Sequence, residues 1–155
     1  SAKRRLWVYN QEFGSGSMLR ALERQAKKGV QVRLIVPQTQ YATFKTDLDA
    51  AARHGIQVRL QSRLYTHAKA VLVDPGSAHA RALVGSMNFT YSGLNLNREL
   101  GMEVGDKAVT DRLQQIFSQD WSRAQRLTLH ASAHKAHHSV KSSCSETECY
   151  IKMPG

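Results

Sequence analysis

The segment from Tyr65 to Asp74 carries the side chains whose types and spacing best suit chemistry, because it places a histidine and a lysine two residues apart in an apolar run. Alternate side chains of a β-strand point to the same face, so His67 and Lys69 are expected to project together. Lys69 offers a positive point charge to a phosphate, and His67 offers a nucleophile or a proton carrier. The pair predicts a site for a phosphate-containing ligand.

Polar side chains of complementary types follow in two further segments. Gly85-Ser86-Met87-Asn88 begins eleven residues after Asp74, and Asn97-Arg98-Glu99 comes next. We predict that the Ser86 hydroxyl and the Asn88 amide hydrogen-bond the same phosphate from a neighbouring strand end. An imidazole, an ammonium, a hydroxyl and an amide would then surround one phosphoryl group.

Alternating strand and helix patterns supply the frame for these side chains. Short apolar runs predict strands over 6–9, 30–36, 56–60, 68–73, 82–84 and 100–104, and 86–98 is predicted as a loop. Helical spacing predicts a first helix capped by Ser17 and ended by Gly29, a second helix with Phe44 and Leu48 on one face, and a closing helix over 109–121. This alternation predicts an α/β sandwich.

The length, composition and charge of the chain exclude several classes of protein. The chain has 155 residues, 41% of them hydrophobic, and 22 Lys+Arg against 12 Asp+Glu give a formal net charge of +10. This length suits one domain with a single core, and the apolar share excludes a disordered or collagen-like chain. No apolar run approaches the roughly 20 residues that span a bilayer. The positive charge favours an anionic partner, which a nucleic acid or an anionic lipid surface would equally provide.

Periodicity is lost after residue 126, so we predict a domain over 1–126 and a flexible polar tail over 127–155. The tail histidines His134, His137 and His138 lack a second set of ligands at a recognisable spacing, so no metal site is predicted.

The two cysteines, Cys144 and Cys149, both lie in this tail. They could close a small disulfide loop in an oxidising compartment or remain free thiols, and free thiols are slightly favoured.

The order His-x-Lys-x4-Asp followed by Gly-Ser-x-Asn resembles the HKD motif of the phospholipase D superfamily. The resemblance extends over about residues 3–126. The stretch 28–33 looks like the family's helix-to-strand passage before the motif, 96–101 looks like the stretch after it, and 117–121 looks like the closing helix.

The resemblance implies an α-β-α sandwich with a mixed central sheet, and a mechanism that needs no metal or other cofactor. One motif's histidine attacks phosphorus and forms a phosphohistidine. A second motif's histidine protonates the leaving oxygen and then activates water or an acceptor alcohol. Both roles suit an imidazole near neutral pH.

The family's site residues are carried over one by one. The resemblance implies that His67 is the nucleophile or the acid–base partner and that Lys69, Ser86 and Asn88 are phosphate ligands. Glu99 matches the family's acidic residue after the motif and could orient an imidazole ring. The last motif residue, Asp74, is expected to be catalytic or, equally, structural.

This chain carries only one such motif, whereas the reaction needs two histidines. The second is expected from the mate in a homodimer or from a missing N-terminal half. Residues 1–6 match a position inside the helix that usually precedes this part of a family repeat, so the chain is expected to be N-terminally incomplete.

The sequence therefore predicts a phospholipase D-like phosphodiesterase that hydrolyses or transfers a phospholipid head group. Two alternatives stay open: a dimeric single-motif endonuclease acting on DNA or RNA, and a non-catalytic half-site that only binds anionic phosphate. A cytoplasmic location or one peripheral to a membrane is favoured, and secretion stays open.

Overall fold

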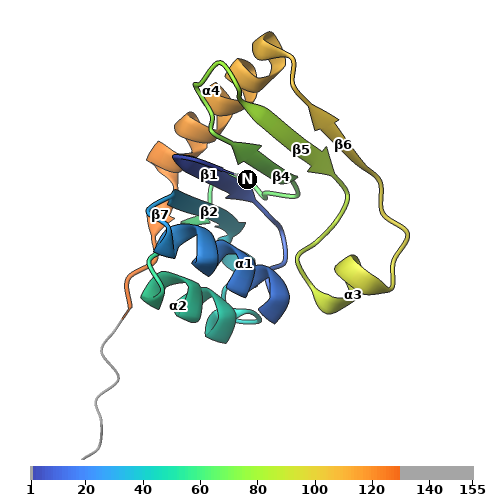
Figure 1. Cartoon of the computed structure of the whole chain (residues 1–155). Helices are drawn as coiled ribbons and strands as arrows, with labels where there is room; N and C mark the ends of the chain where they lie inside the picture. Colours follow the sequence, from blue (N-terminus) through green and yellow to red (C-terminus); the bar gives the residue numbers. More distant parts are fainter. Residues whose placement is uncertain (1, 130–155) are drawn as a thin grey trace, which may run out of the picture.

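The computed structural model of the protein describes residues 2–129 (Figure 1). Cys144, Cys149, His134, His137, His138 and most of the predicted tail lie outside the described residues. The elements in chain order are β1 (Arg5–Tyr9), α1 (Gly16–Lys27), β2 (Gln31–Pro37), a short 3₁₀ helix (Gln38–Gln40), α2 (Lys45–Arg53), β3 (Gln57–Gln61), β4 (Lys69–Val73), β5 (Arg81–Gly85), α3 (Tyr91–Asn95), β6 (Gly101–Val104), α4 (Lys107–Arg123) and β7 (Gln125–Arg126). None of the helices in this part of the chain has the length and apolar character needed to cross a membrane.

The strands form one mixed sheet of seven in the order β6-β5-β4-β1-β2-β3-β7. Strands β1, β2 and β3 run parallel, and every other pairing is antiparallel. The register sets Lys69 opposite Gly85 and Gly85 opposite Gly101. We call this end of the sheet, where β4 begins, β5 ends and β6 begins, the motif end. Strand β1 also finishes there, because Tyr9 pairs with Ala70.

Helices cover both faces of the sheet, which confirms the predicted α-β-α sandwich (Figure 1). Apolar residues at alternate positions of β1 divide between the two faces, as the strand period requires. Leu6 and Val8 enter the core beneath α1 and α2, while Trp7 and Tyr9 pack against α4. The Trp7 and Phe117 rings stack with centroids 4.9 Å apart.

Three local features differ from the prediction. Ser17 does not cap the first helix. Ser15 does, since it has extended dihedral angles and its hydroxyl accepts from Met18 N at 3.4 Å, whereas Ser17 already lies in the first turn. The predicted loop over 86–98 contains the short helix α3, which Thr90 caps. The two-residue strand β7 carries no periodic signal and was not predicted.

The chain remains packed beyond β7. Leu127, the first residue of the predicted tail, donates its backbone N–H to Val58 O at 3.0 Å and packs against the core cluster beneath α1 and α2. The ordered domain thus continues at least one residue past the predicted boundary at 126.

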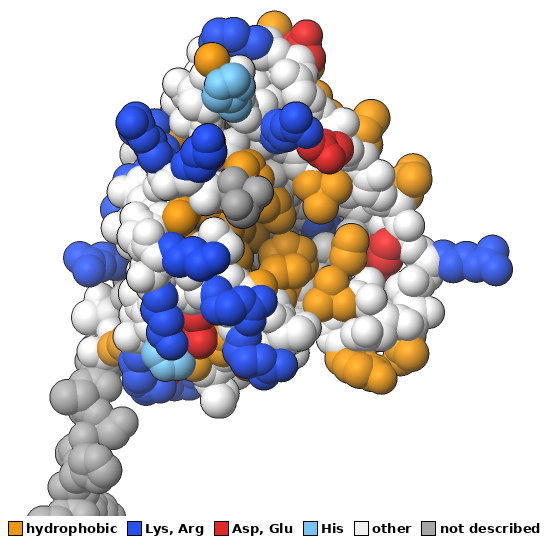
Figure 2. Space-filling model, viewed as in Figure 1, with side chains coloured by type: hydrophobic (Ala, Val, Ile, Leu, Met, Phe, Trp, Pro, Cys, Tyr) orange, Lys and Arg blue, Asp and Glu red, His pale blue; other side chains and the backbone are white. Residues whose placement is uncertain are grey.

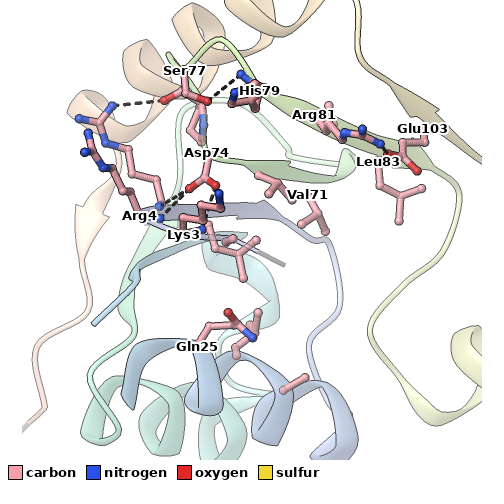
Figure 3. A pocket seen from close by; sticks show the side chains of 18 of the residues that line it. Lys3, Arg4, Gln25, Val71, Asp74, Ser77, His79, Arg81, Leu83 and Glu103 are labelled. Carbon is pink, nitrogen blue, oxygen red and sulfur yellow. Dashed lines mark hydrogen bonds and ion pairs between the residues drawn. The ribbon is translucent and has the colours of Figure 1, made fainter. Parts of the chain in front are cut away.

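Half of one sheet face lacks a covering helix among residues 2–129. Here α1, β4 and β5 border a hollow of about 1080 Å³, whose wall includes Leu22, Val71 and Leu83 (Figures 2 and 3). Hydrophobic side chains show through the opening in Figure 2, and basic side chains lie above, below and to the left of it. Lys3 and Arg4 belong to this rim (Figure 3). We call this feature the apolar groove.

Asp74 ties the start of the chain to the end of β4. Its carboxylate accepts hydrogen bonds from the backbone N–H groups of Lys3, Arg4 and Arg5 at 2.8, 2.7 and 2.9 Å. Burial acts to raise the pKa of Asp74, but these three hydrogen bonds outweigh it and hold the pKa below its ordinary value. The carboxylate therefore stabilises the fold in its ionised form.

Asn10 makes a second clamp, at the C-terminal end of β1. The residue is fully buried, and its side chain donates to Met87 O at 3.2 Å and accepts from Phe89 N at 2.8 Å. One carboxamide thus satisfies a backbone acceptor and a backbone donor in the segment that follows β5. This fixes the Ser86–Asn88 segment against the motif end.

Replacing Asp74 by asparagine is expected to lower the free energy of unfolding by about 2 kcal/mol at neutral pH. Asparagine tolerates the φ of 47° at this position, but its NH₂ group cannot accept a hydrogen bond. Because the folded pKa lies below the unfolded one, the stabilisation is complete above the unfolded pKa and is lost as the pH falls through the folded pKa. Urea unfolding of both proteins between about pH 3 and pH 7 measures this.

Asp111→Asn is the matched control, because Asp111 only pairs with Lys107 on the exposed side of α4. It should change the free energy of unfolding by less than about 0.5 kcal/mol. A difference between wild type and Asp74→Asn that persists undiminished in acid would contradict this role of the carboxylate.

Replacing Asn10 by leucine, which has a similar volume, is expected to cost about 3 kcal/mol of unfolding free energy. Met87 O and Phe89 N would both stay buried without their partner. The cost should appear as a lower urea midpoint with an unchanged slope. Asn95→Leu, which removes one exposed bond to Tyr91 O, should be nearly neutral. Equal losses in the two variants would refute the clamp.

Candidate functional site

His67 and Lys69 meet at the motif end, as their spacing predicts. Lys69 begins β4 and His67 lies two residues before it, in an exposed loop. The Lys69 Nζ lies 3.1 Å from each of the two ring nitrogens of His67 and donates to the His67 backbone O at 2.9 Å. The ammonium and the imidazole therefore form one unit that an incoming anion would meet together.

The ammonium of Lys69 is partly removed from water. Lys69 is only 8% exposed, and its burial lowers the pKa of the side chain, while the Glu12 and Glu99 carboxylates act in the opposite direction. A cation with little solvent around it attracts a phosphate oxygen more strongly than one that is fully hydrated.

Ser86 and Glu99 lie side by side at the same end of the sheet. The pairing of Gly85 with Gly101 aligns the two segments, and the Ser86 hydroxyl donates to Glu99 Oε2. The same hydroxyl accepts from Leu100 N at 3.1 Å, and Asn97 donates to Glu99 Oε1 at 3.2 Å. In the structure Glu99 orients the Ser86 hydroxyl. The imidazole that the resemblance implies as its partner stays a prediction.

Asn88 is held in the segment that Asn10 clamps. Its side-chain Oδ1 is buried and accepts no hydrogen bond from the residues that the structure describes. The backbone of Asn88 is packed against Gly93, where an added Cβ would lie 2.4 Å from Asn88 O. A buried amide without a hydrogen-bond partner is unusual, and it leaves Asn88 able to bind a water or a ligand donor.

Asp74 stands apart from the other predicted site residues. It follows the last residue of β4, at the end of that strand away from Lys69, and it is occupied by the backbone of residues 3–5 (Figure 3). Lys69 and Asp74 are five residues apart along the strand, which corresponds to about 16 Å between their Cα atoms. Of the two roles left open by the sequence, the geometry gives Asp74 the structural one.

Three side chains at the motif end were not singled out from the sequence. Gln11 accepts from Lys69 Nζ at 2.7 Å and donates to the Tyr65 hydroxyl at 2.7 Å, and Asn10 is the clamp described above. One signal could have pointed to Asn10 and Gln11, because they directly follow a buried strand. Ligands of open α/β sheets bind beyond the carboxyl ends of parallel strands.

Within residues 2–129 no three His, Cys, Asp or Glu side chains lie close enough together to hold a metal ion. The groups at the motif end are instead hydrogen-bond donors, one cation and two carboxylates. Such a set can bind a phosphoryl group, orient it against the imidazole and move protons.

Comparison with known proteins identifies the family of this domain. A family model described as "Cardiolipin synthase, PLD-like domain" matches residues 1–121. Cardiolipin synthase A of Pseudomonas entomophila is 28% identical over 134 residues, which cover 83% of this chain and 27% of that protein. The mitochondrial cardiolipin hydrolase of Xenopus tropicalis is 31% identical over 110 residues, covering 70% of this chain and 50% of that protein.

Solved structures share the fold. The phospholipase D family member Nuc from Salmonella typhimurium matches with a TM-score of 0.75 at 20% identity, over 83% of this chain and 85% of that one. NucT from Helicobacter pylori matches with a TM-score of 0.67 at 13% identity, over 81% and 84%. This chain spans about a quarter of the Pseudomonas cardiolipin synthase and most of each of these two solved structures. With a family model that matches most of its length, the chain belongs to the phospholipase D superfamily, in the family of cardiolipin synthase PLD-like domains.

Proposed function

We propose that this domain supplies one half of a phosphodiesterase site in which His67 forms a phosphohistidine. The observation that carries the proposal is the contact of the Lys69 ammonium with the ring nitrogens of His67, 3.1 Å away. A cation in this position would draw a phosphate onto the imidazole, which supports the proposal. Ser86 and Asn88 are proposed as further phosphate ligands.

The proposed reaction has two displacement steps. A ring nitrogen of His67 attacks phosphorus, the bond to the leaving oxygen breaks, and a second imidazole donates a proton to that oxygen. The second imidazole then takes a proton from water or an alcohol, whose oxygen attacks phosphorus and releases His67. Lys69 stabilises the negative charge on the phosphoryl oxygens in both steps.

The second imidazole must come from another copy of this chain or from a segment outside the described residues. His54 pairs with Glu23 at the C-terminal end of α2, and His79 lies in the turn between β4 and β5. Both residues are away from the motif end. Large hydrophobic side chains are exposed near the motif end, among them Leu64, Leu96 and Leu100 at 68%, 69% and 80% (hydrophobic groups over α3 are visible in Figure 2). Exposed apolar side chains of this kind suit a protein contact. A second copy of this chain or another segment of the same protein is the proposed partner.

Phospholipid is the proposed substrate class. The apolar groove begins on the face of β4 that Lys69 shares with Val71, and its rim is basic. Such a groove suits an acyl chain below an anionic head group. The relatives named for cardiolipin support the same class, and the formal charge of +10 suits any anionic substrate.

The wild-type chain is expected to hydrolyse bis(p-nitrophenyl) phosphate in EDTA, and His67→Ala is expected to lose at least about a thousandfold of that rate, because it removes the nucleophile. If a second copy completes the site, the rate per chain should rise with protein concentration. The release of p-nitrophenol measures both.

His54→Ala is the matched control, since it removes an imidazole far from the motif end and should keep the wild-type rate. Activity that survives in His67→Ala would overturn the role of His67. A folded wild-type chain without turnover would mean that a second copy does not complete the site.

With natural substrates, release of the head group from cardiolipin or phosphatidylglycerol vesicles is expected, with little nicking of plasmid DNA under the same conditions. Thin-layer chromatography and gel electrophoresis detect the two products. Cleavage of DNA without turnover of either lipid would replace the lipid assignment by the nuclease alternative.

A further inference from the structure

Gln11 joins two segments at the motif end that carry different functional groups. Its Oε1 accepts from Lys69 Nζ at 2.7 Å, and its Nε2 donates to the Tyr65 hydroxyl at 2.7 Å. The result is a hydrogen-bonded chain that runs from Tyr65 through Gln11 to Lys69 and His67. Neither Gln11 nor Tyr65 belongs to the His-x-Lys motif pair.

The chemistry of lysine sets the orientation of this chain. An ammonium has donors and no acceptor, so the Gln11 atom that faces Lys69 must be the carbonyl oxygen. The NH₂ group therefore faces Tyr65, and the tyrosine oxygen must accept from it. The hydroxyl proton of Tyr65 then points away from Gln11 and can donate to a ligand.

The positions of the side chains suit that donation. Tyr65 is 56% exposed, and its ring lies with its centroid 6.4 Å from that of His67, at an interplanar angle of 30°. The Tyr65 hydroxyl and the Lys69 ammonium bind opposite atoms of one carboxamide, so a single phosphoryl group can reach both.

We propose that Gln11 is a positioning residue that holds Lys69 and Tyr65 as a pair, and that the Tyr65 hydroxyl is an additional ligand of a phosphodiester's non-bridging oxygen. The ligand part rests on the proposed phosphate site at His67. The positioning part stands on the hydrogen bonds alone.

A neutral side chain at position 11 matters because the charges of Glu12 and Glu99 already act to raise the pKa of Lys69, whose ammonium also contacts the imidazole of His67. Glutamine accepts from the ammonium without cancelling its charge. A third carboxylate would hold Lys69 in place but would compete with the phosphate for its charge.

The test uses the full chain with inorganic phosphate as the probe, monitored by NMR of the His67 ring. Tyr65→Phe keeps the ring and removes only the hydroxyl, so it should weaken phosphate binding about tenfold, the value of one charge-assisted hydrogen bond. Gln11→Leu should weaken phosphate binding by a similar factor, because Lys69 and Tyr65 are no longer held in position. Gln11→Glu should also weaken it by a similar factor, because the new carboxylate competes with phosphate for Lys69. Gln38→Leu, an exposed glutamine beyond β2, should leave the affinity unchanged.

The titration of Lys69, followed through its ¹³Cε resonance, separates positioning from general damage to the fold. The Lys69 pKa should fall in Gln11→Leu, which removes an acceptor from the ammonium, and rise in Gln11→Glu, which adds a negative charge. A merely structural role would not produce shifts of opposite sign. Urea unfolding of each variant confirms that the comparison is made on folded protein.

Several results would overturn the inference. If Tyr65→Phe binds phosphate with wild-type affinity, the hydroxyl is not a phosphate ligand. If the Lys69 pKa is unchanged in Gln11→Leu, Gln11 does not position Lys69. A wild-type chain that binds no phosphate would refute the ligand part, while the Lys69 titration still decides the positioning part. Since no turnover is measured, an inactive chain would count against the proposed function and leave this test intact.

Discussion

The buried carboxamide of Asn10 is the interaction on which the rest of the site depends. It lies where the central strand β1 leaves the sheet, and it satisfies a backbone acceptor at Met87 and a backbone donor at Phe89. The next residue, Gln11, reaches Lys69. Two consecutive polar side chains thus join the loop after β5 to the start of β4. Because buried polar groups are costly when unpaired, this junction is stable only when every partner is in place.

The motif residues Lys69 and Asp74 lie at opposite ends of β4 and make different contacts. Lys69 stands at the start of β4 beside His67, while Asp74 follows the end of β4 and binds the backbone of residues 3–5. This separation has an electrostatic consequence. The Asp74 carboxylate lies about 16 Å from Lys69 along β4 and already accepts from three backbone N–H groups, so it does little to neutralise the lysine. The positive charge of Lys69 remains available for a phosphate. Glu12 and Glu99 moderate that charge, and Ser86 and Asn97 occupy the oxygens of Glu99.

Local patterns explain which parts of the fold could be predicted. The short apolar runs over 6–9 and 68–73 and the helical period of the closing helix are properties of neighbouring residues, and the corresponding elements β1, β4 and α4 are present. The short helix α3 and the strand β7 have five and two residues, too few for a period to emerge. Ser15 and Ser17 are both acceptable cap residues, and only the dihedral angles of the folded chain decide between them.

The sequence by itself determined the family of the domain and the presence of an imidazole and an ammonium at one strand end, because both follow from residue types at short spacing. The tertiary structure alone decided that Glu99 binds Ser86, that Asp74 binds the backbone of residues 3–5, and that Asn10, Gln11 and Tyr65 lie at the motif end and hydrogen-bond there. The Glu99–Ser86 contact follows from the pairing of β5 with β6. The other contacts require β1 to lie beside β4, so that residues 54 to 79 positions apart become hydrogen-bond partners. Such pairings depend on the order of strands in the sheet, which the spacing of residues along the chain does not contain.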